Sequence, residues 1–523
     1  MNNIELVTQP VQTIHARVSL LNNELQKVGS FDGTIVSMNL SVDNTSAIRR
    51  TLSLTVTSSD ASGVLKDVEG VWVDKIVKVE YGIYDSEEAT DKWFSLGVFV
   101  LSDSSYSFGV GEQQIDMTLV DLMAMATETR GSQIGSEVTI KADSEIKAAI
   151  EATIRDFTRL TKTKVVSFDD VIPYDLEFDK GTYPYEILKT MVTLLPYYEH
   201  YFSLDGTYMV QLIPMSYYDA VAITADEMDK LIISDQGGGD YSEIANVIEI
   251  WGQEQDAQYT AKTCVTSGTM YQLTIDDTFK ALEDGMTVSF TADSECVRGQ
   301  TLKIQETAEY PLYTMSGDGV YTTIGDGAIL KDVSYCIKYT EQKFILRGEL
   351  DIHGIAMEFN TDPTDEQKQA YRDKYNCPNI SFVINANSRF AVDTPGIGEV
   401  KRVMSGGDYE AIYSTQLALE RARYDLWKAS RLANSKQISC LYAPWLDVNK
   451  KIAYRSIVTG EERQFLVEKI DTSFDGTMNL TISEFFPLYQ WLNESVWGAL
   501  TRVTWGKLKD RAVRWGELTR IEV

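Results

Sequence analysis

The three histidines are the first side chains to consider for chemistry, because imidazole is a common general base and a frequent metal ligand. His15, His200 and His353 lie far apart in the sequence, with no H-E-x-x-H pattern and no cysteine nearby. A zinc site needs several ligands at short, fixed spacings. We therefore interpret all three as solvated or core histidines and predict no metal site.

The cysteines and glycines also lack the spacing of a catalytic site. The five cysteines form no C-x-x-C pair, so we interpret them as small buried residues of a chain made in a reducing cytoplasm: Cys264, Cys296, Cys336, Cys377 and Cys440. No G-x-S-x-G elbow occurs, and the glycine runs at 237–240 and 405–408 lack the Gly-Lys-Ser/Thr ending of a phosphate loop. The sequence therefore predicts no catalytic nucleophile, no cofactor-binding residue and no cofactor.

Carboxylate pairs could bind calcium or hydrolyse a glycosidic bond, since both chemistries need two acids close together. The candidates are the cluster Asp85, Glu87 and Glu88 and the pair Asp169 and Asp170. Neither belongs to the twelve-residue loop pattern of a calcium site. We interpret both as solvated loops, so the chain is not expected to be an enzyme.

The overall charge limits the possible partners. With 77 acidic and 48 basic side chains among 523 residues, the formal charge is −29, which disfavours attraction to nucleic acid phosphates or to anionic membranes. One interpretation is simply a soluble acidic surface, and the other is a wall that DNA can pass without sticking. No run of about 18 apolar residues and no signal-like N-terminus occurs, so we expect neither secretion by that route nor stable membrane insertion.

The elements that must position any site begin with β-strands. In TLSLTVT, Leu52, Leu54 and Val56 alternate with hydroxyl residues, which predicts a strand with one buried and one wet face. Similar segments continue to about residue 126 and indicate a barrel or a sandwich. A short apolar helical turn, DLMAMAT, ends this region.

Helices and hairpins follow. A helix is predicted after Asp143 or Ser144, a second one opens at Pro184, and Asp205-Gly206 marks a hairpin turn. A third helix begins near Ser414 or Thr415, with apolar residues at helical spacing: Leu419, Ala422, Leu426, Ala429 and Ala433. After it the period changes to two, and Asp475-Gly476 predicts a closing hairpin.

Two further segments have distinct patterns. The polar stretch TDPTDEQKQAYRDKYN at 361–376 is interpreted as a short surface helix or a mobile loop. The last 35 residues hold the one internal repeat that we identify, Trp-Gly-x-Leu at 497–500, 505–508 and 515–518. Large apolar side chains that a short segment cannot bury tend to mark a partner surface. We predict partner binding for six residues, with folding back onto the same chain as an equal alternative: Trp497, Trp505, Trp515, Leu500, Leu508 and Leu518.

Several segments resemble one family. They are DYSEIANVIEIWG (240–252), NSRFAVDTPGIGEVKRVMSGGDY (387–409), and the helix ALERARYDLW followed by APWLDVNKKI and the closing hairpin. Together these segments resemble the tail hub proteins of long-tailed bacteriophages and prophages, and the resemblance covers most of the chain.

The resemblance implies a β-rich α+β fold with two tube-like antiparallel β-barrels, an α/β module and an inserted β-domain. It places the first barrel at 1–126 and the α/β module at 127–222. The second barrel is expected in two parts, 235–256 and 401–488, on either side of the inserted β-domain at 257–400. The C-terminal repeat segment occupies 489–523.

The function that the resemblance implies is structural. The chain is expected to form a homotrimeric ring around the DNA channel at the distal end of the virion tail, since two barrels in each of three copies match a sixfold tube. Its expected partners are the tail tube or distal tail protein, a tail-tip or fibre protein, and double-stranded DNA that passes without specific binding. The alternative is a tail-associated cell-wall hydrolase or glycan-binding tip protein, although the 35 residues after the hub resemblance are few for a hydrolase domain. A bacterial adhesin ranks last.

Overall fold

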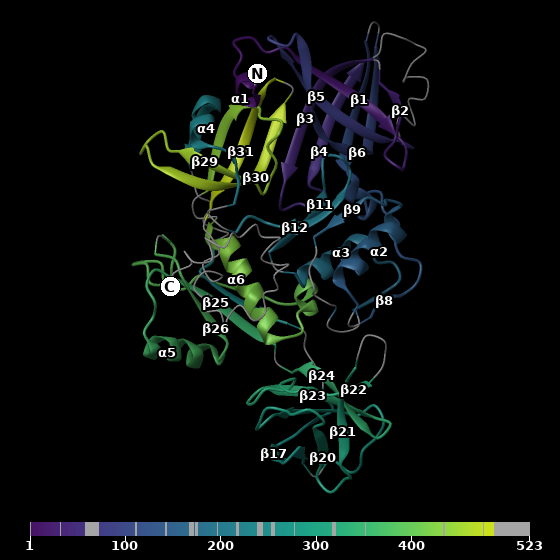
Figure 1. Ribbon diagram of the computed structural model, residues 1–523, viewed down its shortest axis with the longest axis vertical. Coiled ribbons are helices and arrows are strands. Elements are labelled where there is room, and N and C mark those ends of the chain that lie inside the picture. The colour runs from purple at the N-terminus through teal and green to yellow at the C-terminus, as the bar shows by residue number, and fades with distance from the viewer. Residues whose placement is uncertain are drawn as a thin grey trace.

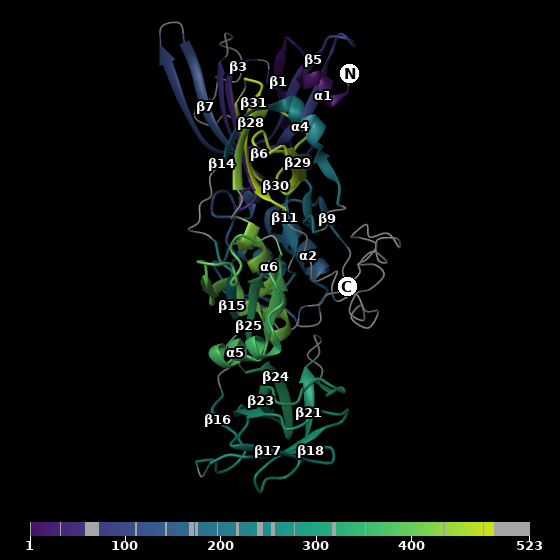
Figure 2. The same ribbon diagram turned by 90° about the vertical axis from the view of Figure 1, so that its left-hand side faces the viewer.

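The molecule is elongated, with a large sheet at one end, helices and small sheets in the middle and a separate β-domain at the other end (Figures 1 and 2). The computed structural model describes residues 2–31, 33–57, 73–109, 112–141, 144–166, 172, 176–195, 197–215, 219–237, 244–252, 257–276, 278–315, 321–350, 352–386, 388–431, 435–473 and 475–485.

The N-terminal region is β-structure, as its alternating sequence predicts. A one-turn helix α1 with a capping box between Asn2 and Glu5 precedes the strands, and a 3-10 turn, η2, follows them where DLMAMAT predicts a helical turn. The elements are α1 (Asn3–Val7), β1 (Ile14–Leu21), β2 (Lys27–Ser30), β3 (Thr34–Asp43), β4 (Arg50–Thr57), β5 (Ile76–Asp85), β6 (Thr90–Gly109), β7 (Glu112–Asp121) and η2 (Leu122–Met125).

Strands from the middle and the end of the chain extend the same sheet. The strand order is β14-β28-β31-β30-β3-β4-β7-β6-β5-β1-β2, and β13 and β29 complete 13 strands. The predicted turn at Asp475-Gly476 joins β30 and β31 as an antiparallel hairpin. The added elements are β13 (Val221–Ile223), α4 (Ala225–Leu231), β14 (Ile232–Gly237), β28 (Ser435–Leu441), β29 (Lys451–Arg455), β30 (Glu462–Ser473) and β31 (Thr477–Glu484).

The β-rich character is confirmed, but the sheet differs from the expected pair of barrels. β3 and β30 pair directly from Asn39 opposite Ser473 to Asp43 opposite Lys469, so the two ends of the chain form one open sheet in the described residues. Their apolar side chains also share one core, in which Leu54 and Val79 lie together with Ile438 and Leu480. Burying these faces against each other removes more apolar surface from water than two small separate cores could.

The segment after η2 holds two helices and two small sheets. α3 begins at Pro184, as predicted, and β11 and β12 form the hairpin predicted at Asp205-Gly206. The first predicted helix is α2, although Glu145 and not Ser144 occupies its N-cap position. The elements are β8 (Val138–Ile140), α2 (Ile146–Thr158), β9 (Thr163–Val165), β10 (Leu176–Phe178), α3 (Pro184–Thr193), β11 (Tyr198–Phe202) and β12 (Tyr208–Leu212).

A four-stranded sheet, in the order β26-β25-β15-β27, lies between two helices in the middle of the molecule (Figure 1). The predicted long helix is α6, which packs on one face of this sheet, and the polar stretch at 361–376 forms a helix, α5, against which the other face packs. The elements are β15 (Val247–Trp251), β25 (His353–Phe359), α5 (Asp365–Tyr375), β26 (Ile380–Ile384), β27 (Lys401–Met404), η4 (Gly407–Ala411) and α6 (Thr415–Arg431).

This sheet corrects the expected grouping of 235–256 with 401–488. β15 and β27 pair with each other and belong to the four-stranded sheet, so only β14 and β28 to β31 extend the large one. The reason is burial on both faces: Val247, Ile248 and Ile250 of β15 are all fully buried, which suits a sheet that has a helix on each side.

The remaining strands, β24 among them, form the domain at the lower end of the molecule in Figure 1. They occupy 259–349 and have a core of their own, so the inserted domain is shorter than the expected 257–400. The strands are β16 (Tyr259–Thr260), β17 (Thr263–Ser267), β18 (Met270–Thr274), β19 (Thr287–Thr291), β20 (Thr301–Ile304), β21 (Tyr310–Met315), β22 (Tyr321–Thr323), β23 (Ser334–Thr340) and β24 (Lys343–Glu349). We call this unit the distal domain.

Candidate assembly surface

One face of the 13-stranded sheet is covered by small polar side chains. In β4, Leu52, Leu54 and Val56 are buried in the core, whereas Ser53 is exposed and Thr55 is half-buried. Successive side chains of a strand point to opposite faces, so the hydroxyl residues of β4 all lie on the side away from the core.

Strand pairing aligns these polar residues across the sheet. Ser53 of β4 lies opposite Asn39 of β3 and Thr118 of β7, and Ser41 of β3 lies opposite Asp471 of β30. Directly opposed residues point to the same side. We call the set the polar face, and its members are Ser234 and Gln236 (β14), Gln437 and Ser439 (β28), Asn479 and Thr481 (β31), Lys469, Asp471 and Ser473 (β30), Ser37, Asn39 and Ser41 (β3), Thr51, Ser53, Thr55 and Thr57 (β4), Gln114, Asp116 and Thr118 (β7), and Asp103, Ser105 and Ser107 (β6).

The polar face is net acidic, because it holds three carboxylates, Asp103, Asp116 and Asp471, and one amine, Lys469. Lys469 Nζ lies 2.9 Å from a carboxylate oxygen of Asp471, which also accepts a hydrogen bond of 2.6 Å from the Ser41 hydroxyl. Because its single cation is paired within the face, the polar face offers no free positive charge to a phosphate.

The two edges of the sheet are the second part of the surface. Among the described strands the sheet ends at β14 on one side and at β2 on the other. Ile233 on β14 is 56% exposed and Val28 on β2 is 55% exposed. An edge strand presents backbone N–H and C=O groups that can pair with another strand. The two edges differ in sequence, so a contact between them would join copies head to tail.

A long hairpin is the third part. β6 and β7 pair from Phe99 opposite Asp121 out to Gly109 opposite Glu112, and Figure 2 shows this hairpin extending beyond the rest of the sheet. On its outer half, consecutive residues such as Ser105 and Tyr106 are both exposed. A strand pair that is exposed on both faces is available for contact with another molecule.

Contacts behind the polar face connect the two ends of the chain. The Tyr81 and Tyr442 rings meet edge to face with centroids 4.9 Å apart, and Phe94 packs on Trp445 at 6.1 Å. The sequence stretch APWLDVNKKI, on which the family resemblance partly rests, thus packs against β6 of the N-terminal region through Trp445, and Tyr442 just before it packs against β5.

Two buried arginines join three regions at the base of the sheet. Arg50 donates to the carbonyl oxygen of Phe202 at 2.7 Å and pairs with Asp447. Arg49 Nη2 lies 2.6 Å from Glu199. Both side chains are almost completely buried, and removing one member of a buried ion pair leaves an uncompensated charge. These residues had no recognisable pattern in the sequence, because their partners are 150 residues or more away.

The polar face does have a signal in the sequence, which is a second internal repeat. The Trp-Gly-x-Leu repeat is therefore not the single internal repeat that we identified above. The segment SFDGT at 30–34 recurs at 473–477, and MNLSV at 38–42 recurs as MNLTI at 478–482. The two MNL segments belong to β3 and β31, which flank β30 on either side. The repeat therefore marks two equivalent strands of the polar face.

The three histidines each contact a polar side chain of the fold. His15 Nδ1 lies 2.9 Å from Asp91 at the surface, and His353 Nε2 lies 2.9 Å from Glu249 in the four-stranded sheet. His200 stacks on Tyr185 and shares a hydrogen bond of 3.0 Å with the hydroxyl of Tyr208. Burial, and then the positive charges of Arg49 and Lys189, lower the pKa of His200 to about 4, so its ring is neutral at pH 7.

The acidic cluster at 85–88 is a capped turn. The Asp85 carboxylate accepts hydrogen bonds from the backbone N–H groups of Glu87 and Glu88, at 2.9 and 3.2 Å, and lies 3.1 Å from Lys92. Burial tends to raise the pKa of Asp85, but Lys92 and the two backbone donors together lower it to about 2. The second acidic pair, Asp169 and Asp170, lies outside the described residues.

The predicted partner-binding residues, Trp497, Trp505, Trp515, Leu500, Leu508 and Leu518, also lie outside the described residues. Within the part of the chain that the structure describes, no three His, Cys, Asp or Glu side chains are grouped to hold a metal ion. In that same part, no helix has the length and apolar character that crossing a membrane requires.

Comparison with family models and curated proteins covers little of the chain. Residues 387–489 match a model described as "Domain of unknown function (DUF5048)". This match includes α6 and β27 to β31, and so contains three of the eight polar-face strands, β28, β30 and β31. No curated protein sequence matches the chain.

Comparison with solved structures gives matches over most of the chain, at low sequence identity. A tail protein from Neisseria meningitidis has a TM-score of 0.44 and 9% identity, covering 90% of this chain and 96% of that one. A 43 kDa tail protein of a Shewanella oneidensis prophage has a TM-score of 0.44 and 8% identity, covering 90% and 98%. The Francisella PdpA-VgrG complex has a TM-score of 0.41 and 7% identity, covering 92% and 54%.

Proposed function

We propose that this chain is a structural hub at the distal end of a phage tail tube, where copies of it form a ring around the DNA channel. The observation that supports this proposal is the polar face, which aligns hydroxyl, amide and carboxylate side chains over eight strands from both ends of the chain. A structural role needs no cofactor, and we propose that the chain has no catalytic activity.

The chemistry of the polar face suits a channel wall. Lysine and arginine side chains bind phosphates by releasing counterions, so a basic wall would hold DNA. Lys469 is engaged by Asp471, and the remaining charges of the face are acidic. Hydroxyl and amide groups exchange hydrogen bonds with water at little cost, so DNA can slide past them without sticking.

The sheet edges support a ring of three copies. We propose that β14 of one copy lies beside β2 of the next, which is a head-to-tail contact that repeats by rotation and can close. The repeat of SFDGT and MNL in the two ends of the chain provides two related units in each copy. Three copies then supply six related units, which matches a sixfold tail tube.

The other surfaces supply the axial contacts in this proposal. The β6–β7 hairpin contacts the tail tube or distal tail protein, and the opposite end of the molecule faces a tail-tip or fibre protein. We propose that the C-terminal Trp-Gly-x-Leu segment binds one of these tail components, with Trp497, Trp505 and Trp515 as its anchors. Each indole can bury about 200 Å², which suffices for a partner contact.

Sedimentation equilibrium at micromolar concentration tests the ring. Val28→Lys on β2 introduces a charge at the proposed contact and is expected to convert a trimer to monomers. Val265→Lys is the matched control, because Val265 is 57% exposed on β17 of the distal domain. Electron microscopy of assembled tails extends the test: a chain placed away from the tube axis, or a monomer in the assembled tail, contradicts the proposal.

A truncation after Leu488 tests the C-terminal segment separately. It leaves β31 intact, so the thermal unfolding midpoint is expected to stay within a few degrees while attachment of the next tail component is lost. If the truncated chain instead unfolds, the segment folds back onto its own sheet, which is the alternative to partner binding.

A further inference from the structure

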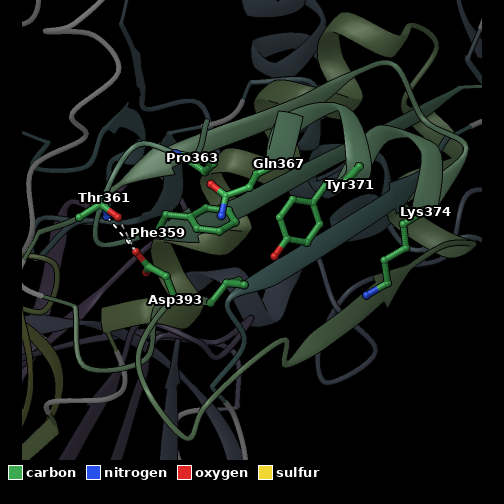
Figure 3. Close-up of a pocket in the computed structure, with 9 residues that line it drawn as sticks. Phe359, Thr361, Pro363, Gln367, Tyr371, Lys374 and Asp393 are labelled. Atoms are coloured by element: carbon green, nitrogen blue, oxygen red, sulfur yellow. Dashed lines mark hydrogen bonds between the residues drawn. The ribbon is translucent and has the colours of Figure 1, made fainter. Parts of the chain in front are cut away.

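A pocket of about 420 Å³ lies beneath helix α5 (Figure 3). This helix lies in the middle of the molecule, away from the 13-stranded sheet (Figure 1). The volume of the pocket falls in the range of small-molecule sites, roughly 300–1,000 Å³. The lining side chains come from the end of β25, from the loop that joins it to α5, from α5 itself and from the loop before β27: Phe359, Thr361, Pro363, Gln367, Tyr371 and Asp393, with Ala370, Lys374 and Val392.

Hydrogen bonds at the entrance of α5 hold the walls in place. The Asp393 carboxylate accepts from the backbone N–H of Asn360 at 2.6 Å and from the backbone N–H and hydroxyl of Thr361 at 3.0 and 2.9 Å. Thr364 and Gln367 form a capping box, in which Gln367 Oε1 accepts from the Thr364 N–H at 2.9 Å. The pocket is therefore a preformed feature of the fold.

Aromatic rings form the apolar part of the pocket. The Tyr371 ring meets Phe359 edge to face with centroids 5.6 Å apart, and it also contacts Phe382 at 6.2 Å. Phe359 is buried and Tyr371 is half-buried. Figure 3 shows the Tyr371 ring projecting from α5 beside Phe359, with Gln367 above the pair.

Two donor groups beside these rings are unused in the fold. Gln367 uses its side-chain oxygen in the capping box, and within the described residues neither its amide nitrogen nor the hydroxyl of Tyr371 has a hydrogen-bond partner. Burial raises the pKa of Tyr371, so this hydroxyl is protonated at neutral pH. Both groups extend from α5 into the pocket (Figure 3).

The charges around the pocket disfavour an ionic ligand. Lys374 Nζ is paired with Glu399 at 2.6 Å, so no free cation is present in the lining to bind a phosphate. The Asp393 carboxylate already accepts three hydrogen bonds, which leaves little capacity for a metal ion. The lining instead suits a neutral ligand that has an apolar face and hydroxyl or amide groups at its edge.

A pyranose ring has this character, because its C–H groups pack on aromatic rings while its hydroxyl groups form hydrogen bonds at the rim. We propose that the pocket beneath α5 binds a neutral saccharide, with Tyr371 as the apolar contact and with the Tyr371 hydroxyl and the Gln367 amide as hydrogen-bond donors. This site does not depend on the ring proposed above, since all its residues belong to one copy and lie outside the large sheet.

Saturation-transfer NMR on the full-length protein tests the proposal, with the N-acetylglucosamine trimer and maltotriose as probes. At least one probe is expected to bind with a dissociation constant near the millimolar range. Tyr371→Phe keeps the ring and removes the hydroxyl, and Gln367→Glu keeps the capping oxygen and removes the amide donor. Each change is expected to weaken binding about five- to tenfold, the effect of one lost hydrogen bond.

The matched control is Tyr84→Phe, which removes an exposed tyrosine hydroxyl from β5 and is expected to leave binding unchanged. Thermal unfolding of each variant checks that the fold is intact. The proposal is overturned if neither saccharide shows saturation transfer, or if the transfer is the same in Tyr371→Phe, Gln367→Glu and the unmodified protein.

Discussion

The 13-stranded sheet and the distal domain are both built from β-strands, yet they use the chain in opposite ways. The sheet joins residues from both ends of the sequence, and its Ser41–Asp471 hydrogen bond spans 430 positions. The distal domain is continuous from 259 to 349 and has its own core. The chain enters and leaves it at one point, where the Gly252 N–H donates to the Ile352 carbonyl at 2.9 Å.

Because the two regions use the chain differently, we expect mutations to affect them differently. The sheet places polar residues from distant segments on one face and depends on buried charges such as Arg50 for its attachment to β11. The distal domain contains ion pairs with an exposed member, such as Lys343–Glu341, in which Glu341 is the exposed partner. We therefore expect the sheet to be sensitive to changes at either chain end and the distal domain to behave as an independent unit.

Deletions are expected to give the largest contrast. Removing residues from 435 onward takes away β28 to β31 and more than a third of the buried residues of the shared core, so the N-terminal strands should also fail to fold. Replacing 253–351 by a short Gly-Ser turn should leave the sheet folded, because the ends of this segment already touch. Circular dichroism and limited proteolysis measure both outcomes. A folded N-terminal region in the first deletion would contradict the shared core.

Charge removal is expected to give the next largest contrast. Arg50→Met leaves Asp447 and the Phe202 carbonyl without their buried partner, at a cost of about 3–5 kcal/mol in unfolding free energy. The matched change Lys343→Met in the distal domain breaks a pair whose Glu341 is 73% exposed, for less than about 1 kcal/mol. Urea unfolding measures both, and equal losses would argue against a special role for the buried arginine.

Acid is expected to lower the stability of the region that holds the 13-stranded sheet and β11, because His200 on β11 has a lowered pKa. Its pKa is lowered from 6.5 to about 4 in the fold, so between these values the unfolded chain binds a proton that the folded chain does not. Stability should therefore fall as pH decreases from about 6.5 to 4, by up to roughly 3 kcal/mol. His200→Gln should lack this component, which urea unfolding at pH 7 and 4.5 measures.

The distal domain is the internal control for this experiment, because residues 257–350 contain no histidine. The urea midpoint of distal-domain unfolding, followed by nuclear magnetic resonance, is expected to change little over the same pH range. If the loss of stability between pH 7 and 4.5 is the same in His200→Gln as in the unmodified protein, a group other than His200 causes it.

Substitutions on the polar face are expected to have the smallest effect on stability. Ser53 and Asn479 are exposed, so Ser53→Arg and Asn479→Arg together should change unfolding free energy by about 0.5 kcal/mol or less. The double variant should nevertheless retain double-stranded DNA in a way that weakens as salt increases. Ser267→Arg in the distal domain, tested by the same gel-shift assay, should retain none.

Local sequence patterns were enough to determine the individual elements. Pro184 opens α3 because its fixed φ suits the first helical turn, and Asp205-Gly206 and Asp475-Gly476 turn hairpins because glycine accepts positive φ, 80° at Gly206 and 83° at Gly476. The apolar spacing of α6 and the alternation of β4 were likewise sufficient. Each of these signals acts over a few residues, so neighbouring residues contain the whole of the information.

Tertiary structure alone decided which strands pair and what their exposed faces become. Nothing near Asn39 specifies that β3 lies beside β30. Likewise, nothing near Val247 specifies that β15 belongs to the four-stranded sheet between two helices and not to the large sheet. The hydroxyl residues of β4 predicted a wet face, but only the register of eight strands turned such faces into one surface. Pairing partners are selected by burial of the opposite faces in a common core, and that selection operates between segments hundreds of residues apart.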